Sequence, residues 1–164
     1  MNNQARLNDI EEILEMLYEK LGSFQKRLIF SDSQSAKFEL KQQIKREILP
    51  DIRKYETEYW ELYPQEAIII SDEEAEKQLV KVEQAVDSIE KTTSDKYSSE
   101  LIPLLHTIRD KLDNQDKAAS AKLKLVLPLI PALASYELEL ETQGLLSKVF
   151  TPKIIQTIRS KLSR

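Results

Sequence analysis

His106 is the chain's one histidine, and histidine is the side chain that most often moves protons near neutral pH. Asp110 follows it by four residues, which puts both side chains on one face of a helix. A Ser-His-Asp site would also need a nucleophile on a tight, glycine-flanked turn, and neither Gly22 nor Gly144 provides one. We therefore expect His106 to be an ordinary exposed or half-buried helix residue, and we predict no enzyme activity.

Metal and cofactor sites are not expected either. The chain has no cysteine, so thiolate ligands are excluded, and one histidine cannot supply the two Glu-x-x-His pairs of a di-iron bundle. No glycine-rich loop is present to cradle a phosphate group. We predict no cofactor.

Acidic side chains cluster in two places. The first run is Glu11, Glu12, Glu15 and Glu19, and the second is Glu137, Glu139 and Glu141. The first run fits the outer face of a coiled coil or, alternatively, a partner-binding face. The second run alternates, so on a helix its members splay around the axis, and we expect them to be solvated.

A basic stripe on the second predicted helix consists of Lys37, Lys41 and Lys45. Such a stripe can follow a phosphate backbone. The same helix also carries acidic side chains, namely Glu39, Glu47 and Asp51. We therefore do not favour nucleic acid as a partner.

Tyr55, Tyr59, Trp60 and Tyr63 form the densest aromatic cluster. Two interpretations remain open for it. These side chains either close the open end of a helical hairpin as core, or form an exposed partner-binding patch, because Tyr and Trp are enriched at binding hot spots.

The elements that position these residues are predicted to be all helical. Two glycines in 164 residues are too few for many tight turns, and the dominant residues favour helix. The N-terminus has acids where a secretory signal would have an apolar core, and no run approaches the roughly 20 apolar residues of a membrane span. With no cysteine, a cytoplasmic location fits best.

Residues 1–63 are predicted to form a long antiparallel coiled-coil hairpin. The first helix, over about residues 5–29, has an a/d seam of Leu7, Ile10, Leu14, Leu17, Leu21, Phe24 and Leu28. Ser31 and Gln34 match a capping box that would start the second helix. Its apolar positions are Leu40, Ile44, Ile48, Ile52, Tyr55, Tyr59 and Leu62, and Pro50 should bend it near Glu47.

Residues 64–71 are predicted to be a linker, and residues 72–164 a four-helix bundle. Ser71 and Glu74 match a second capping box, and Asp116 is a candidate N-cap further on. The run "KLKLVLPLIPALASYELELE" (122–141) is too short to span a bilayer, and its prolines exclude a central strand. We predict a bent central helix, with the bend between Leu127 and Pro131 and with Leu125, Leu129 and Tyr136 inside.

The last 20 residues, 145–164, carry five basic and no acidic side chains, on a chain of net charge −4. They are Lys148, Lys153, Arg159, Lys161 and Arg164. We expect a basic C-terminal helix that folds back onto the acidic body or meets an anionic surface such as a membrane.

Two segments resemble a known family. They are "KFELKQQIKREILPDIRKYETEYWELY" (37–63) and "LIPLLHTIRDKL…AASAKLKLVLPLIPALASYELELET" (101–142). Both look like the helical effector-associated domains of cyanobacterial conflict and programmed-death proteins, which occur beside caspase-like, TIR or STAND NTPase domains. The resemblance implies an adaptor that joins effectors and sensors through helix–helix contacts, and it supplies no catalytic residues.

The sequence thus predicts a non-enzymatic interaction module that self-associates or docks onto another helical protein. The alternative is a membrane-active effector that applies residues 123–164 to anionic lipid. Bilayer contact is the lesser of the two expectations.

Overall fold

The computed structural model describes residues 3–64, 70–91 and 99–140, and these parts of the chain are helical, with no strand among them. The predicted all-α class is confirmed. The described residues belong to two compact units, the first ending at Leu62 and the second beginning at Tyr63.

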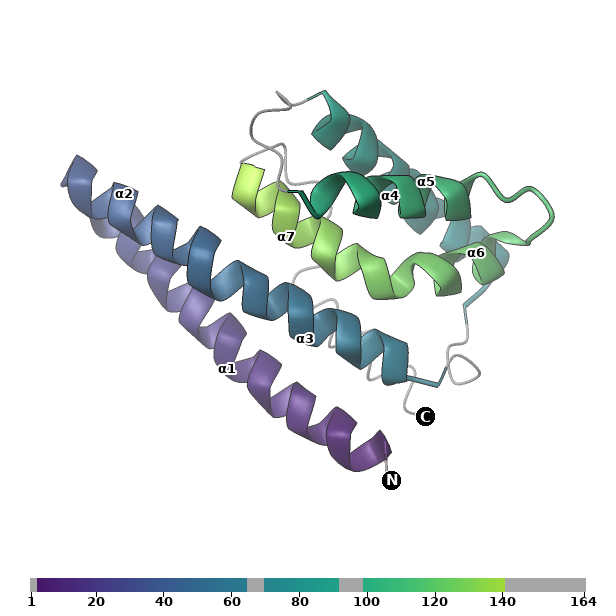
Figure 1. Ribbon diagram of the computed structural model, residues 1–164, viewed down its shortest axis with the longest axis horizontal. Coiled ribbons are helices and arrows are strands. Elements are labelled where there is room, and N and C mark those ends of the chain that lie inside the picture. Colours follow the sequence, from purple (N-terminus) through teal and green to yellow (C-terminus); the bar gives the residue numbers. More distant parts are fainter. Residues whose placement is uncertain (1–2, 65–69, 92–98, 141–164) are drawn as a thin grey trace. The chain divides into compact units, whose positions relative to one another are not determined.

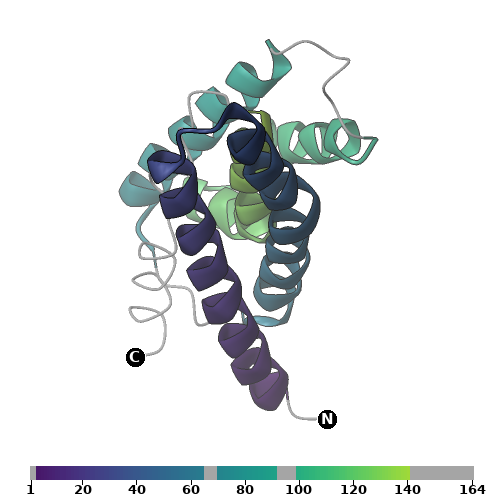
Figure 2. The same ribbon diagram turned by 90° about the vertical axis from the view of Figure 1, so that its left-hand side faces the viewer.

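The first unit is an antiparallel helical hairpin (Figure 1). Its first arm is α1 (Asn3–Phe30), and its second arm is built from α2 (Gln34–Gln43), the short helix η1 (Ile44–Ile48) and α3 (Leu49–Leu62). Figure 2 shows the two arms side by side along their length. Burial follows the predicted seam at Leu7, Ile10, Leu14 and Leu21, whereas Leu17, Phe24 and Leu28 are only half-buried.

The turn at the tip of the hairpin differs from the prediction. The N-cap of α2 is Ser33, whose hydroxyl oxygen accepts a hydrogen bond from the backbone N–H of Ala36 at 3.3 Å. Ser31 lies one residue after α1 ends, too early to reach the first turn of α2, so the predicted Ser31 cap is wrong.

The bend predicted at Pro50 is a single π-helical turn, η1, in which the N–H of Leu49 bonds to the carbonyl of Ile44 five residues back. Proline lacks an N–H, and in a regular α-helix its ring would clash with the carbonyl four residues earlier, which belongs to Arg46. A wider turn directly before the proline accommodates both effects without ending the helix.

The π turn also keeps one apolar stripe against α1. Leu40, Ile44, Ile48 and Ile52 are spaced by four, and each such step overshoots a 3.6-residue turn by about 40°. An unbroken α-helix would therefore rotate the stripe away from α1. Because a π turn takes more residues per turn, Leu40, Ile48 and Ile52 are all buried.

The second unit contains α4 (Asp72–Glu90), α5 (Leu101–Leu112), α6 (Ala119–Val126), the 3₁₀ turn η4 (Leu127–Leu129) and α7 (Ile130–Leu140). Helix α4 packs against α6 and α7, and α5 packs against α6 (Figure 1). Ser71 caps α4 as predicted, by accepting from the N–H of Glu74 at 3.2 Å. The fourth predicted helix of this bundle, after Gly144, lies outside the described residues.

The proline-rich helix bends where predicted. The 3₁₀ turn η4 separates α6 from α7 within the predicted interval, and Tyr136 is buried. Leu125 and Leu129 are half-buried, however, and the fully buried positions include Leu123, Val126, Leu127, Ile130 and Leu133. The tighter 3₁₀ turn has three residues per turn, so it rotates the buried face away from the one that a continuous α-helix predicts.

Helix α6 is capped from another helix rather than from its own sequence. The backbone N–H of Ser120 donates to Oδ1 of Asp72, in the first turn of α4, at 3.0 Å. Hydrogen bonding from Ser120, first from its side chain and then from this backbone N–H, lowers the pKa of Asp72. The predicted cap, Asp116, lies before the N-cap position, which is Ala118 and makes no side-chain bond.

Candidate functional site

A buried carboxyl group lies between the two arms of the hairpin. Glu56 on α3 has no exposed surface, and its two oxygens accept from Tyr18 Oη at 2.9 Å and from Trp60 Nε1 at 3.1 Å. Tyr18 belongs to α1, so this network joins the two arms through hydrogen bonds to a group that is costly to bury without partners.

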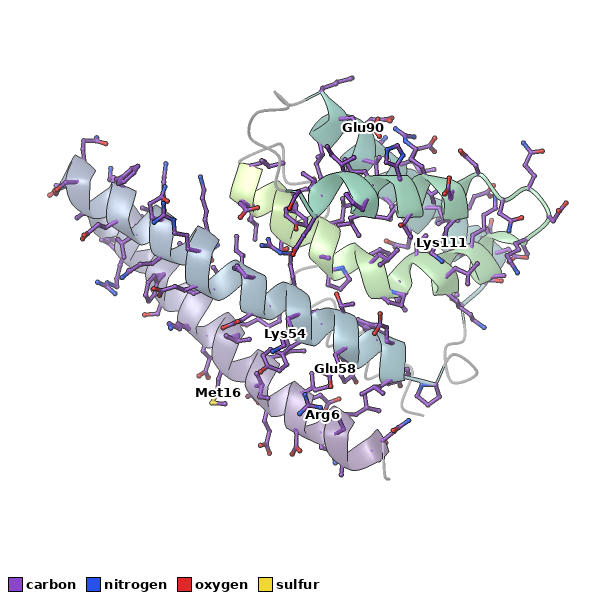
Figure 3. All side chains as sticks on the ribbon, in the orientation of Figure 1. Arg6, Met16, Lys54, Glu58, Glu90 and Lys111 are labelled. Atoms are coloured by element: carbon purple, nitrogen blue, oxygen red, sulfur yellow. The ribbon has the colours of Figure 1, made fainter. Side chains whose placement is uncertain are left out.

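Two further polar contacts join the same arms. Tyr59 Oη donates to Glu11 Oε1 at 2.7 Å. Arg6 and Glu58 form a two-pronged ion pair at the open end, with nitrogen–oxygen distances of 2.5 and 3.0 Å (Figure 3). The hydrogen bonds from Arg6 lower the pKa of Glu58, and the same contact raises the pKa of Arg6. These three pairings set the register of α1 on α3.

The aromatic cluster divides between core and surface. Tyr59 is 1% exposed and Trp60 3% exposed, and their rings meet edge to face with centroids 5.2 Å apart. The core interpretation is therefore correct for Tyr59 and Trp60. The alternative, an exposed patch, is wrong for these two residues, because both are buried and donate hydrogen bonds to glutamates of the hairpin. Tyr55 and Tyr63 are half-buried, and their contact with a partner stays a prediction.

Two glutamates are buried although the sequence does not predict it, Glu56 on α3 and Glu137 on α7. Glu56 falls between Ile52 and Tyr59 on the buried stripe of α3, and Glu137 lies four residues after the buried Leu133 on α7. The prediction that Glu137 is solvated is wrong, because its side chain is 1% exposed. Helical spacing could have predicted this burial, since both glutamates lie three or four residues from core side chains on the same helix face.

His106 is exposed on α5, as is Asp110 one turn later. Among the described residues, no group of three or more acidic or histidine side chains is arranged to hold a metal ion. A search of the same residues finds no helix with both the length and the apolar character of a membrane span.

The outer face of α1 exposes an apolar side chain among carboxylates. Met16 is 62% exposed, and Glu12 and Glu19 lie one turn before and one turn after it on the same side, with Glu15 adjacent. All three glutamates are exposed. This acidic face of α1, defined by Glu12, Glu15, Met16 and Glu19, lies opposite the buried seam (Figure 3).

The predicted cations of the C-terminal segment lie outside the described residues. They are Lys148, Lys153, Arg159, Lys161 and Arg164. The apolar run that precedes them is described, and most of its residues from Val126 to Ala134 are buried within the second unit. Insertion of residues 123–164 into a membrane would therefore require the core of the second unit to unfold.

Comparisons of the chain with protein-family models, with curated proteins and with solved structures gave no match.

Proposed function

We propose that this chain is a non-enzymatic helical interaction module whose acidic face of α1 binds a basic, amphipathic helix of a partner. The observation that carries the proposal is the exposed Met16 between Glu12 and Glu19. An apolar anchor flanked by like charges suits a helix with an apolar stripe and basic edges, in the manner of coiled-coil flanking positions.

The hairpin is suited to present such a face. Its two arms are joined by the Arg6–Glu58 pair and by the bonds of Tyr18 to Glu56 and of Tyr59 to Glu11. A preorganised face loses less entropy on binding than one that must fold first.

A second copy of the chain carries a segment of the required chemistry. Residues 145–164 have five basic and no acidic side chains, with Ile154, Ile155, Ile158 and Leu162 at helical spacing. Assembly is thus homotypic in its simplest form, and a different basic helix is the heterotypic form. A place in a bacterial conflict or signalling system rests on the resemblance of residues 37–63 and 101–142, and a cytoplasmic location rests on the absence of cysteine.

The test measures self-association of the full chain by sedimentation equilibrium across micromolar to near-millimolar concentrations. Reversing two charges together, Glu12→Lys with Glu19→Lys, should weaken association by about tenfold or more, because like charges then face each other across the interface. The control reverses two exposed acids of the second unit, Glu83→Lys with Asp110→Lys, and should leave association unchanged.

A synthetic peptide of residues 145–164 provides a direct assay of the same face. It should bind the full chain in a salt-sensitive way and lose affinity for the Glu12→Lys, Glu19→Lys variant. The proposal fails if the chain stays strictly monomeric and neither this peptide nor another basic amphipathic helix binds the acidic face of α1.

A further inference from the structure

The tip of the hairpin exposes three large apolar side chains. Ile29 is 75% exposed and Phe30 82% exposed at the end of α1, and Phe38 is 64% exposed in α2. The turn that joins the two helices is only three residues long, residues 31–33, so all three side chains belong to one end of the hairpin. Grouped exposed apolar side chains of this size mark a contact site more often than isolated ones do.

The same tip is strongly basic. Residues 20–46 carry seven basic and two acidic side chains. The rest of the hairpin, residues 3–19 and 47–62, carries three basic and ten acidic side chains. Charge is therefore segregated along the hairpin, with a cationic tip and an anionic open end.

The two ends are far enough apart to act separately. Helix α1 has 28 residues and is therefore roughly 42 Å long at 1.5 Å per residue. This length is several times the Debye length of about 8 Å at physiological ionic strength. A surface that meets the tip is thus screened from the acidic end.

We propose that the hairpin tip binds the surface of an anionic lipid bilayer. Phe30, Phe38 and Ile29 enter the interfacial layer, and the surrounding cations, among them Lys26, Arg27 and Lys37, lie among the anionic headgroups. Exposed apolar side chains ringed by Lys and Arg have the chemistry of interfacial membrane binding. The acidic open end would be repelled if it approached such a surface itself, so the hairpin docks tip first.

A second copy of the chain fits the tip less well. Its acidic half would satisfy the cations, but Met16 is the one strongly exposed large apolar side chain in the described part of that half. Three apolar side chains at the tip would then lack matching partners. A nucleic-acid duplex, whose bases are already stacked on one another, would satisfy the cations alone and leave Phe30 and Phe38 in water.

The test is cosedimentation of the full chain with phosphatidylcholine vesicles that contain or lack phosphatidylserine. Binding should require phosphatidylserine and weaken with salt. Phe30→Ser with Phe38→Ser should lower binding by about tenfold or more, since each ring loses apolar contact with the bilayer. Val80→Ser with Ile102→Ser, which alters two exposed apolar side chains of the second unit, is the matched control and should bind like the wild type.

The charge contribution is tested separately. Neutralising Lys26→Gln with Lys37→Gln should lower binding by about fivefold for each charge removed. The matched variant Lys77→Gln with Lys117→Gln removes two exposed cations from the second unit and should have no effect. Circular dichroism should show wild-type helicity and melting for the phenylalanine variants, because both side chains are exposed.

Insertion has its own readout. Phe30→Trp should add a fluorescence component that brominated lipids quench, whereas the buried Trp60 of the wild type should not be quenched. The inference is overturned if anionic vesicles do not bind the chain, if the phenylalanine variants bind as well as the wild type, or if those variants change only self-association. Self-association through the acidic face of α1 is measured without lipid, so the two proposals fail independently.

Discussion

At the scale of single residues, the hairpin is held by polar bonds placed inside an apolar seam. Glu56 would be costly to bury in hydrocarbon surroundings, yet hydrogen bonds from Tyr18 and Trp60 compensate its desolvation. Such a bond stabilises only one pairing of the two arms, because a shift of one residue would leave Glu56 without Tyr18. Apolar contacts tolerate small shifts better, so the polar bonds specify the register.

Removing one of these hydrogen bonds should lower the free energy of unfolding by a measurable amount. Tyr18→Phe keeps the ring and deletes the hydroxyl that donates to Glu56, so we expect a loss of about 1.5–3 kcal/mol in the free energy of unfolding, the range for hydrogen bonds to charged groups. Urea denaturation followed by circular dichroism measures it. Tyr55→Phe is the control, because it also deletes a hydroxyl but leaves the half-buried ring in place. Lys54 Nζ lies over that ring, 5.2 Å from its centroid, and this contact is kept. Equal effects of the two substitutions would contradict the network.

Adjacent residues on α1 allow a second comparison. Leu17 packs against the buried cluster of Leu21, Ile48, Leu49 and Ile52, whereas Met16 faces outward. Leu17→Asp should destabilise the hairpin by about 2–4 kcal/mol, because it loses apolar contacts and half-buries a charge. Met16→Asp should stay within about 0.5 kcal/mol of the wild type. Thermal and urea melting would show the difference, and wild-type stability of Leu17→Asp would mean that the seam is exposed.

At the scale of elements, helix ends are decided by which side chain reaches the first backbone N–H groups. Ser33 reaches the N–H of Ala36 and Ser71 reaches that of Glu74, each from the extended backbone conformation that N-caps prefer. Helix α6 receives the equivalent bond from Asp72 of α4. A helix can therefore begin where its own sequence has no capping side chain.

The caps predict a clear ranking of serine substitutions. Ser33→Ala should cost about 1 kcal/mol, the usual value for an N-cap. Ser31→Ala should cost less, since Ser31 Oγ reaches only the carbonyl of Ser33, at 3.5 Å. Urea melting of the two variants ranks them, and the reverse order would place the cap at Ser31 after all.

At the scale of the whole molecule, two compact helical units share one chain, and each has its own ion pairs between helices. In the first unit Arg6 bonds Glu58, and in the second Arg109 of α5 bonds both Asp87 and Glu90 of α4, at nitrogen–oxygen distances of 2.5 and 2.8 Å. All these groups are partly exposed, so each pair contributes modestly to stability. Acid sensitivity should therefore come from several small contributions in both units.

Acidification should weaken both units in a defined window. The pKa values of Glu58 and Asp72 are lowered in the folded chain, by hydrogen bonds from Arg6 and Ser120 respectively. A lowered folded pKa contributes stability above the unfolded pKa, near 4, and that contribution is lost as the pH falls through the folded value. The melting temperature of the wild type should therefore decrease when the pH is lowered below about 4.

Asp72→Asn isolates one such group. It should melt below the wild type at neutral pH and converge with it in acid, because both chains then have a neutral side chain at this position. Glu73→Gln removes a charge from the same turn of α4 without touching the bond to Ser120, and its melting temperature should change less at neutral pH. A difference between Asp72→Asn and the wild type that persists in acid would show that the charge of Asp72 is not the cause.

The sequence by itself determined the helical class, the order of the described helices and both proline-dependent breaks. Apolar spacing, scarce glycine and the fixed geometry of proline act within a few residues, so they can be recognised without knowing the fold. This is why the bend at Pro50, the cap at Ser71 and the bend at residues 127–129 were predictable.

The tertiary structure decided which polar groups are buried and which apolar groups are not. Glu56, Glu137 and the bond from Ser120 to Asp72 depend on neighbours that are distant in the sequence, as does the exposure of Phe30 and Phe38. Helical spacing says which residues share a face, but only packing says what covers that face. The candidate surfaces, the acidic face of α1 and the basic apolar tip, are the faces that the described packing leaves exposed.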